Sequence, residues 1–172
     1  MAESDPGAAP LDGAFTVARV FDAPRDVVWK AWTEAEHLER WWGPKGFTVR
    51  HCAVDLRPGG VFHYGLQAPG GTTMWGRWVF REIAAPERLV FVASFSDAQG
   101  GMTRNPWAAD WPAETLSMVA FAERGGRTEV TLTGIALDAT EAERAAFAAG
   151  FTSMRQGWAG TFDQLGAYLA RA

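Results

Sequence analysis

The sequence contains a single cysteine, Cys52, among its 172 residues, so no intrachain disulfide can form. Disulfides are rare in the reducing cytoplasm, and a cytoplasmic location is therefore expected. Cys52 lies in an apolar, strand-like segment with no cationic cluster beside it that would lower its pKa, which favours packing over a nucleophilic role. No apolar run approaches the ~20 residues of a membrane-spanning helix. The N-terminal residues also lack the basic start and apolar core of a signal peptide.

Positive charge is also scarce. The net charge of −4 argues against a nucleic-acid-binding protein, which would carry a basic face, and against binding to an anionic membrane. The three histidines, His37, His51 and His63, show no i, i+4 spacing and have one cysteine to complement them, so a tetrahedral metal site is not expected. His51 and His63 could still face each other across adjacent strands.

Signatures of common catalytic centres are missing as well. The sequence has no Gly-x-Ser-x-Gly segment. Its glycine pairs at 59–60, 70–71 and 125–126 lie between strand-like segments, where positive φ is useful, and they do not form a phosphate-binding loop. The sequence therefore predicts no catalytic residue, no metal and no cofactor.

Large aromatic side chains are abundant by contrast. The chain has 9 tryptophans and 11 phenylalanines but 2 tyrosines. Its length suits one domain, and this composition indicates either a large apolar core or a cavity lined by rings. Residues 1–13 are rich in Ala, Gly, Pro and acidic residues and show no periodicity, which predicts a disordered tail before a single domain at 14–172.

The order of the periodic segments predicts most of the fold. Residues 15–21 alternate as a strand. Asp22 and Pro24 then open a short helix, and the capping-box sequence Thr33–Glu36 begins a second one. Further strands with short turns indicate an antiparallel meander of about six or seven strands in all, at residues 47–56, 61–68, 73–83, 88–95, 115–123 and 127–136. Residues 96–112 are expected to form a long irregular loop.

The last segment has a helical period instead. A second capping-box sequence starts at Thr140, and apolar residues then recur at spacings of three and four up to Leu169, which predicts one long helix. One face of a curled sheet is the surface large enough to bury its apolar stripe. The alternation within the strands predicts the residues of that face: Phe62, Tyr64, Leu66, Trp78, Phe80, Leu89, Phe91, Ala93, Val119, Phe121, Val130 and Leu132. The predicted class is α+β, with a curved antiparallel sheet around a long C-terminal helix.

Two features favour a cavity between sheet and helix over a filled core. The middle of the helix carries bulky, adaptable side chains, Phe151, Met154 and Trp158, whereas its end carries compact leucines. Loop 96–112 is long and contains two tryptophans, which suits a lid over the pocket mouth or an interface. The candidate ligand-binding residues are Trp42, Phe62, Tyr64, Trp78, Phe91, Trp107, Phe151, Met154 and Trp158, with Arg155 as a cation at the pocket edge. The alternative for each ring is plain core packing, and for Arg155 a surface position.

Several segments together resemble the AHSA-type family of the START-like superfamily, which is named for homology to an activator of a heat-shock-protein ATPase. They are Asp22–Trp29, Thr33–Pro44, Val54–Phe62 with its Asp-x-Arg-x-Gly-Gly turn, Gly76–Ile83, Pro86–Val90 and Gln156–Trp158. Each motif is short, but their order and spacing match over residues 15–170. The resemblance implies the helix-grip fold of the birch-pollen allergen.

Three functions remain open, because this fold supports binding, transport, cyclase and adaptor roles. Binding of an apolar, ring-containing small molecule is favoured by the aromatic concavity. An adaptor or chaperone cofactor in a stress response, as the family name suggests, would use an exposed patch such as the Trp-rich loop for a chaperone or homodimer contact. A cyclase- or hydrolase-type enzyme is least favoured, because no perturbed acid or base can be assigned to the pocket.

Overall fold

A computed structural model describes residues 13–171, so the tail predicted at residues 1–13 lies outside the described residues except for Gly13. The elements follow one another nearly as the sequence predicts. They are β1 (Phe15–Phe21), α1 (Arg25–Thr33), α2 (Ala35–Trp41), β2 (Thr48–Val54), β3 (Val61–Gln67), β4 (Thr73–Ala84), β5 (Arg88–Ser96), β6 (Met102–Thr103), β7 (Thr115–Arg124), β8 (Arg127–Ala136), α3 (Glu141–Ala149) and α4 (Phe151–Arg171).

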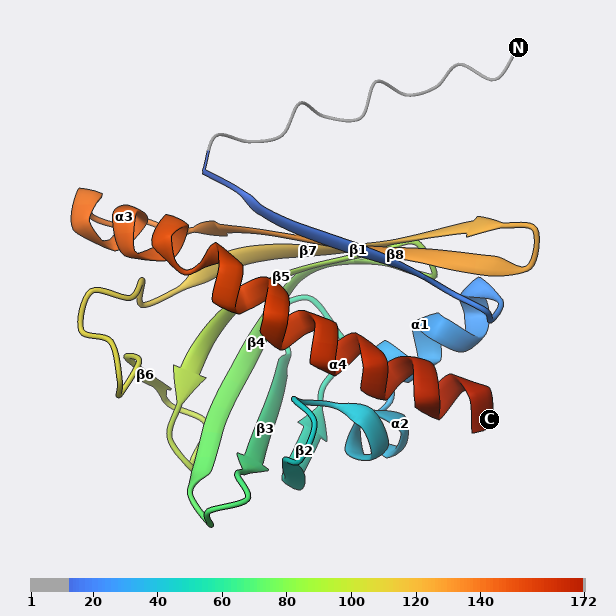
Figure 1. Cartoon of the computed structure of the whole chain (residues 1–172), viewed down its shortest axis with the longest axis horizontal. Coiled ribbons are helices and arrows are strands. Elements are labelled where there is room, and N and C mark those ends of the chain that lie inside the picture. Colours follow the sequence, from blue (N-terminus) through green and yellow to red (C-terminus); the bar gives the residue numbers. More distant parts are fainter. Residues whose placement is uncertain (1–12, 172) are drawn as a thin grey trace.

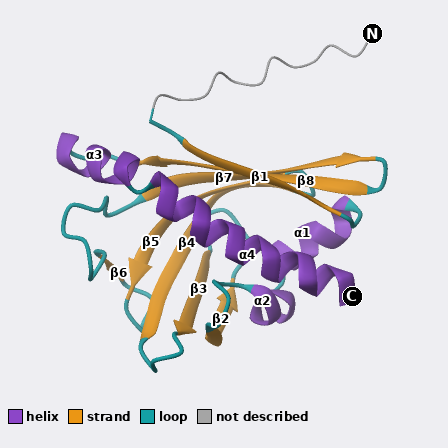
Figure 2. Ribbon diagram, viewed as in Figure 1, coloured by secondary structure: helices purple, strands orange, loops and turns teal. Residues whose placement is uncertain are grey.

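The strands form one antiparallel sheet in the order β1-β8-β7-β5-β4-β3-β2, and the two-residue β6 pairs with β5. The sheet curls, and α4 runs across its concave face (Figure 1). Helices α1 and α2 lie beside the C-terminal half of α4, at one end of the concave face (Figure 2). The predicted α+β fold, a curved sheet around a long C-terminal helix, is confirmed. In the part of the chain that the structure describes, no helix combines the length and apolar character needed to cross a membrane.

The core lies between the concave face of the sheet and α4. All the residues predicted to face inward are buried except Tyr64 and Ala93, which are half-buried. Period-2 alternation therefore assigned the two faces of these strands correctly, because one face packs against the helices and the other faces solvent. Trp32 of α1 lies in the middle of this core, with its ring against those of Trp41 and Trp158.

One of the two predicted capping boxes is wrong. Thr33 is the last residue of α1, and its hydroxyl donates to the carbonyl oxygen of Trp29 at 2.8 Å. Helix α2 begins after Glu34, without a side-chain cap. A threonine hydroxyl can bond the carbonyl four residues back as readily as it can cap a helix, so the motif alone did not decide between the two. The box at Thr140 is confirmed, since its hydroxyl accepts from the Glu143 amide at 3.1 Å.

The predicted single C-terminal helix is two helices, α3 and α4, separated at Gly150. A Cβ added at Gly150 would lie 2.9 Å from the ring of Trp111, which belongs to the long loop. The Gly150 amide closes α3 by donating to the carbonyl oxygens of Ala146 and Phe147, each at 3.1 Å. The apolar period continues through this point, so the period alone could not reveal the break, which accompanies a contact made from 39 residues upstream in the chain.

Candidate functional site

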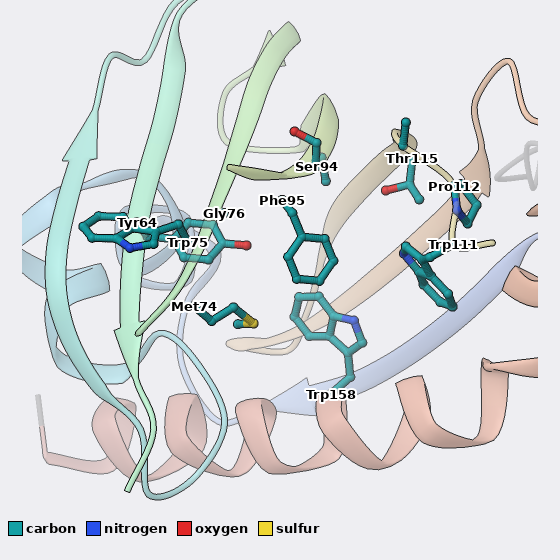
Figure 3. A pocket seen from close by; sticks show the side chains of 12 residues that line it. Tyr64, Met74, Trp75, Gly76, Ser94, Phe95, Trp111, Pro112, Thr115 and Trp158 are labelled. Atoms are coloured by element: carbon teal, nitrogen blue, oxygen red, sulfur yellow. The ribbon is translucent and has the colours of Figure 1, made fainter. Parts of the chain in front are cut away.

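A hollow remains between the concave face of the sheet and the middle of α4 (Figure 3). Its inner compartment has a volume of about 170 Å³ and is lined by Phe15, Tyr64, Trp78, Phe91, Ala93, Trp111, Thr115, Ser117, Leu132, Gly134, Phe147, Met154 and Trp158. Its outer groove has a volume of about 280 Å³ and is lined by Tyr64, Met74, Trp75, Gly76, Ala93, Ser94, Phe95, Trp111, Pro112, Ala113, Thr115 and Trp158. The two compartments adjoin, because five residues line both.

Small residues on the inner face of the sheet make room for this hollow. Tyr64 of β3 is paired with Gly76 of β4, and a Cβ at Gly76 would lie 2.3 Å from the Tyr64 hydroxyl oxygen, so the phenol ring lies directly over the glycine. Ala93 of β5 is paired with Trp78 on one side and with Thr115 on the other. A larger side chain at position 76 or 93 would occupy the space between these rings.

Tyr64 is the only ionisable side chain among the described residues that line the two compartments. Burial raises its pKa above the ordinary value for a phenol, and a hydrogen bond from Trp78 opposes this rise without cancelling it. Tyr64 therefore stays neutral around pH 7 and offers a hydroxyl that can donate or accept. The hydroxyls of Thr115 and Ser117 add two more such groups to an otherwise apolar wall.

The wall of the hollow that belongs to α4 is held by the core. Trp158 stacks against Trp32 with ring centroids 6.2 Å apart and an interplanar angle of 15°. It also contacts Trp42 at 5.8 Å. On the sheet side, Trp78 and Phe91 stack at 3.9 Å with an angle of 13°. These ring contacts fix the walls before any ligand enters, as is usual for small-molecule sites.

The loop between β6 and β7 forms the mouth of the hollow. Trp111 lines both compartments and packs on Phe147 of α3, with ring centroids 5.5 Å apart. Arg104 ties the loop to α3, since its guanidinium lies 3.2 Å from a carboxylate oxygen of Glu143. Trp107 lies on the outside, 67% exposed, and packs on Phe95 at 6.1 Å. Whether this loop moves as a lid stays a prediction.

The structure brings together half of the predicted ligand-binding residues. Those that line the inner compartment are Tyr64, Trp78, Phe91, Met154 and Trp158. The other five lie elsewhere. Trp42 and Phe62 are buried behind the rings of Trp78 and Tyr64. Phe151 packs on Phe15, and the guanidinium of Arg155 lies over the same Phe15 ring. Trp107 lies on the surface of the loop.

Sequence reasoning did not assign the remaining lining residues to the site. The most prominent of them are Met74, Phe95, Trp111, Thr115 and Ser117. Trp75 also borders the outer groove, but its ring stacks on His63. The sequence could have indicated Trp111 as a lining residue, because it lies in the long Trp-rich loop 96–112, next to a proline. Phe95 continues the inward alternation of Phe91 and Ala93 along β5, so its assignment was also within reach of the pattern.

Cys52 lies outside the hollow, half-buried between β2 and α2, with its sulfur 3.7 Å from the carbonyl oxygen of Ala35. Burial, with a smaller contribution from the negative charge of Glu39, raises the pKa of the thiol to about 11.

At pH 8 a thiol with that pKa is about 0.1% thiolate, whereas a thiol at the unperturbed pKa of 9.0 is about 10% thiolate. We expect iodoacetamide to alkylate Cys52 about 100-fold more slowly in the folded protein than in urea, as followed by mass spectrometry. Equal rates in both states would contradict this assignment.

Comparison with known proteins agrees with this architecture. The family model described as "Activator of Hsp90 ATPase homolog 1-like protein" matches residues 22–170. A search of curated proteins found no match.

Several solved structures share the fold. A crystal structure of a protein from Nitrosomonas europaea aligns with a TM-score of 0.72 at 24% identity, over 92% of this chain and 94% of that one. One from Mycobacterium smegmatis gives 0.72 at 26% identity, over 91% and 90%. A solution structure from Arthrobacter aurescens gives 0.74 at 27% identity, over 92% and 87%.

The matched range begins just after β1 and extends into the last turn of α4, so it includes nearly every element that builds the hollow. The solved structures align over about nine-tenths of this chain, so they share its overall arrangement of strands and helices. The chain therefore belongs to the family of Activator of Hsp90 ATPase homolog 1-like proteins.

Proposed function

We propose that this protein binds an apolar, ring-containing small molecule in the hollow between the sheet and α4. The observation that supports it is the pair of adjoining compartments, walled by aromatic side chains that the core already holds in place. Apolar concavities with a few polar groups are the usual form of small-molecule sites. A cytoplasmic location, expected from the single cysteine, is part of the same proposal.

The size of the inner compartment suits one aromatic ring. An apolar cavity of roughly 150 Å³ stays dry and takes up benzene, and this compartment measures about 170 Å³. Small-molecule pockets typically span about 300–1,000 Å³, so a larger ligand would extend into the outer groove. Trp111 and Trp158, which line both compartments, would then flank the ligand where it passes from one to the other.

The lining favours a neutral ligand. No charged side chain lines either compartment among the described residues, and burying an unpaired charge among apolar groups is costly. The hydroxyls of Tyr64, Thr115 and Ser117 can hydrogen-bond a carbonyl, hydroxyl or amine at the end of the ligand. The same lining offers no acid–base pair that works near pH 7, which favours binding over cyclase or hydrolase chemistry.

N-Phenyl-1-naphthylamine tests this proposal, because it is neutral and consists of a phenyl group and a naphthyl group joined by an amine. We expect saturable binding at one probe per chain, with probe fluorescence excited through the neighbouring tryptophans. Native mass spectrometry of freshly purified protein would reveal a bound molecule directly. The proposal fails if the probe shows no saturable binding and the native spectrum shows the mass of the bare chain.

The lid role of the Trp111 loop has its own test. Hydrogen exchange of residues 104–114 should slow when the probe binds, because a ligand in the outer groove would press against Trp111 and order the loop around it. Residues 127–130, at the end of β8 away from the mouth, line neither compartment and serve as an internal reference. Unchanged exchange in the loop at saturating probe would rule out a lid.

A chaperone-cofactor or adaptor role is the second candidate. It rests on the description of the family and on the exposed side chains of Trp107 (67%) and Met102 (46%) in segment 96–112. Exposed apolar groups of this kind can mark a partner surface. Stimulation of the ATPase of a bacterial Hsp90 by this protein, lost in Trp107→Ala, would support that role. No stimulation at saturating protein would exclude it.

A further inference from the structure

Two histidines face each other on the outer face of the sheet, away from the hollow. His63 of β3 alternates with the inward Phe62 and Tyr64, and His51 of β2 is paired with Gly65, two residues beyond His63. The imidazole centroids of His51 and His63 are 4.7 Å apart with an interplanar angle of 59°. The pairing considered from the sequence is therefore present, formed between diagonal neighbours on adjacent strands.

This separation matches that of two imidazoles on one metal ion. A metal–nitrogen bond is about 2.0–2.1 Å, which places each ring centroid roughly 3.2 Å from the metal. For nitrogen–metal–nitrogen angles between about 90° and 109°, the two centroids then lie roughly 4.5–5.2 Å apart. The observed centroid distance of 4.7 Å falls inside that interval.

The environment of His63 leaves one ring nitrogen free to coordinate. Its Nε2 lies 3.0 Å from the carbonyl oxygen of Asp97, and a carbonyl can only accept, so Nε2 carries the proton. The lone pair is then on Nδ1, and a backbone carbonyl on the other nitrogen is the usual outer partner of a metal-binding histidine. Gly100 lies against this ring, and a Cβ added to it would be 3.8 Å from Nδ1.

Neighbouring groups hold the rings and leave the site open to water. Trp75 stacks on His63 at 5.3 Å with an angle of 20°, and its centroid lies 5.8 Å from that of His51. The Oδ1 atom of Asp97 is engaged within its own turn, where it accepts from the amides of Gln99 and Gly101, each at 2.9 Å. His51 is exposed, so solvent can fill the remaining coordination positions.

We propose that His51 and His63 form a two-imidazole site for a divalent transition-metal ion, with Cu²⁺ preferred over Ni²⁺ and Zn²⁺. Imidazole suits all three ions, and affinity for nitrogen ligands peaks at copper in this series. The sequence predicts no metal site, and this proposal departs from that expectation because the site needs only two protein ligands, with water in the remaining positions. It is separate from the ligand hollow and does not depend on it.

Electron paramagnetic resonance with one equivalent of Cu²⁺ tests the proposal. We expect nitrogen hyperfine structure from two imidazoles. Cu²⁺ should also quench tryptophan fluorescence, and this quenching should be largely absent in Trp75→Phe. His51→Phe and His63→Phe keep a ring in place but remove the ligand. Each should weaken Cu²⁺ binding by at least roughly 10–100-fold, because losing a group that merely hydrogen-bonds to a metal ligand already costs that much.

His37→Gln is the matched control, because it removes the third histidine, which lies with Glu34 and Glu36 in a separate group of possible ligands and contacts Tyr168. Cu²⁺ binding should be unchanged in this variant, and its loss would place the ion at that group instead. Cu²⁺ affinity equal to that of the parent in both His51→Phe and His63→Phe would overturn the proposal, as would hyperfine structure from a single nitrogen. N-Phenyl-1-naphthylamine binding should be unaltered in all three variants, which keeps this result independent of the proposed ligand site.

Discussion

Replacing Trp32 by alanine is expected to lower the free energy of unfolding by about 3–5 kcal/mol, as usual for a buried aromatic residue. Trp32 is 1% exposed. Its ring centroid lies 5.1 Å from that of Trp41 and 6.2 Å from that of Trp158, so the substitution empties a space that helices α1, α2 and α4 share. Urea denaturation followed by far-ultraviolet circular dichroism measures the loss, and the melting temperature should fall by roughly 2–4 °C per kcal/mol.

Two further variants sharpen this test. Trp107→Ala removes the same side chain from an exposed position and should change stability by no more than about 0.5 kcal/mol. Trp32→Phe should cost much less than Trp32→Ala, because the Trp32 Nε1 is buried without a hydrogen-bond partner among the described residues, so its removal breaks no bond. A loss in Trp107→Ala as large as that in Trp32→Ala would contradict the assignment of Trp32 to the centre of the core.

Filling the hollow is expected to have the largest effect on ligand binding. Ala93 lines both compartments, and Ala93→Leu places three additional carbon atoms where a ligand ring would lie. Forcing extra atoms into occupied space costs about 1–3 kcal/mol, so the affinity for N-phenyl-1-naphthylamine should fall roughly 5- to 150-fold. Fluorescence titration measures this change.

Ala122→Leu is the matched control for this substitution. Ala122 lies in β7 like its neighbour Phe121, but it is exposed on the opposite face of the sheet. The same three carbon atoms there meet solvent, so probe affinity should equal that of the parent. Probe binding that survives Ala93→Leu, in a protein whose circular dichroism is unchanged, would place the probe outside this hollow.

The sequence by itself determined the seven longer strands and the buried face of β3, β4, β5, β7 and β8, whereas the short β6 lies in the segment expected to be an irregular loop. On β8, Val130 and Leu132 alternate with Glu129, Thr131 and Thr133, and the covered face follows from that alternation without knowledge of the partner strands. The capping box at Thr140 likewise depends on residues three positions apart. These assignments succeeded because each depends on side chains that are neighbours along the chain.

Only the tertiary structure decided the break at Gly150, the role of Thr33 and the presence of a hollow. The ring of Trp111 lies where a side chain at Gly150 would be, and this contact joins residues that no local pattern relates. Whether α4 fills the concave face depends on the combined volumes of Tyr64, Ala93, Trp158 and many other side chains, and on how far the sheet curls. A periodic apolar stripe predicts that one face of a helix is buried. The size of the cavity beside that helix depends instead on how well side chains from distant parts of the chain fill the space between helix and sheet.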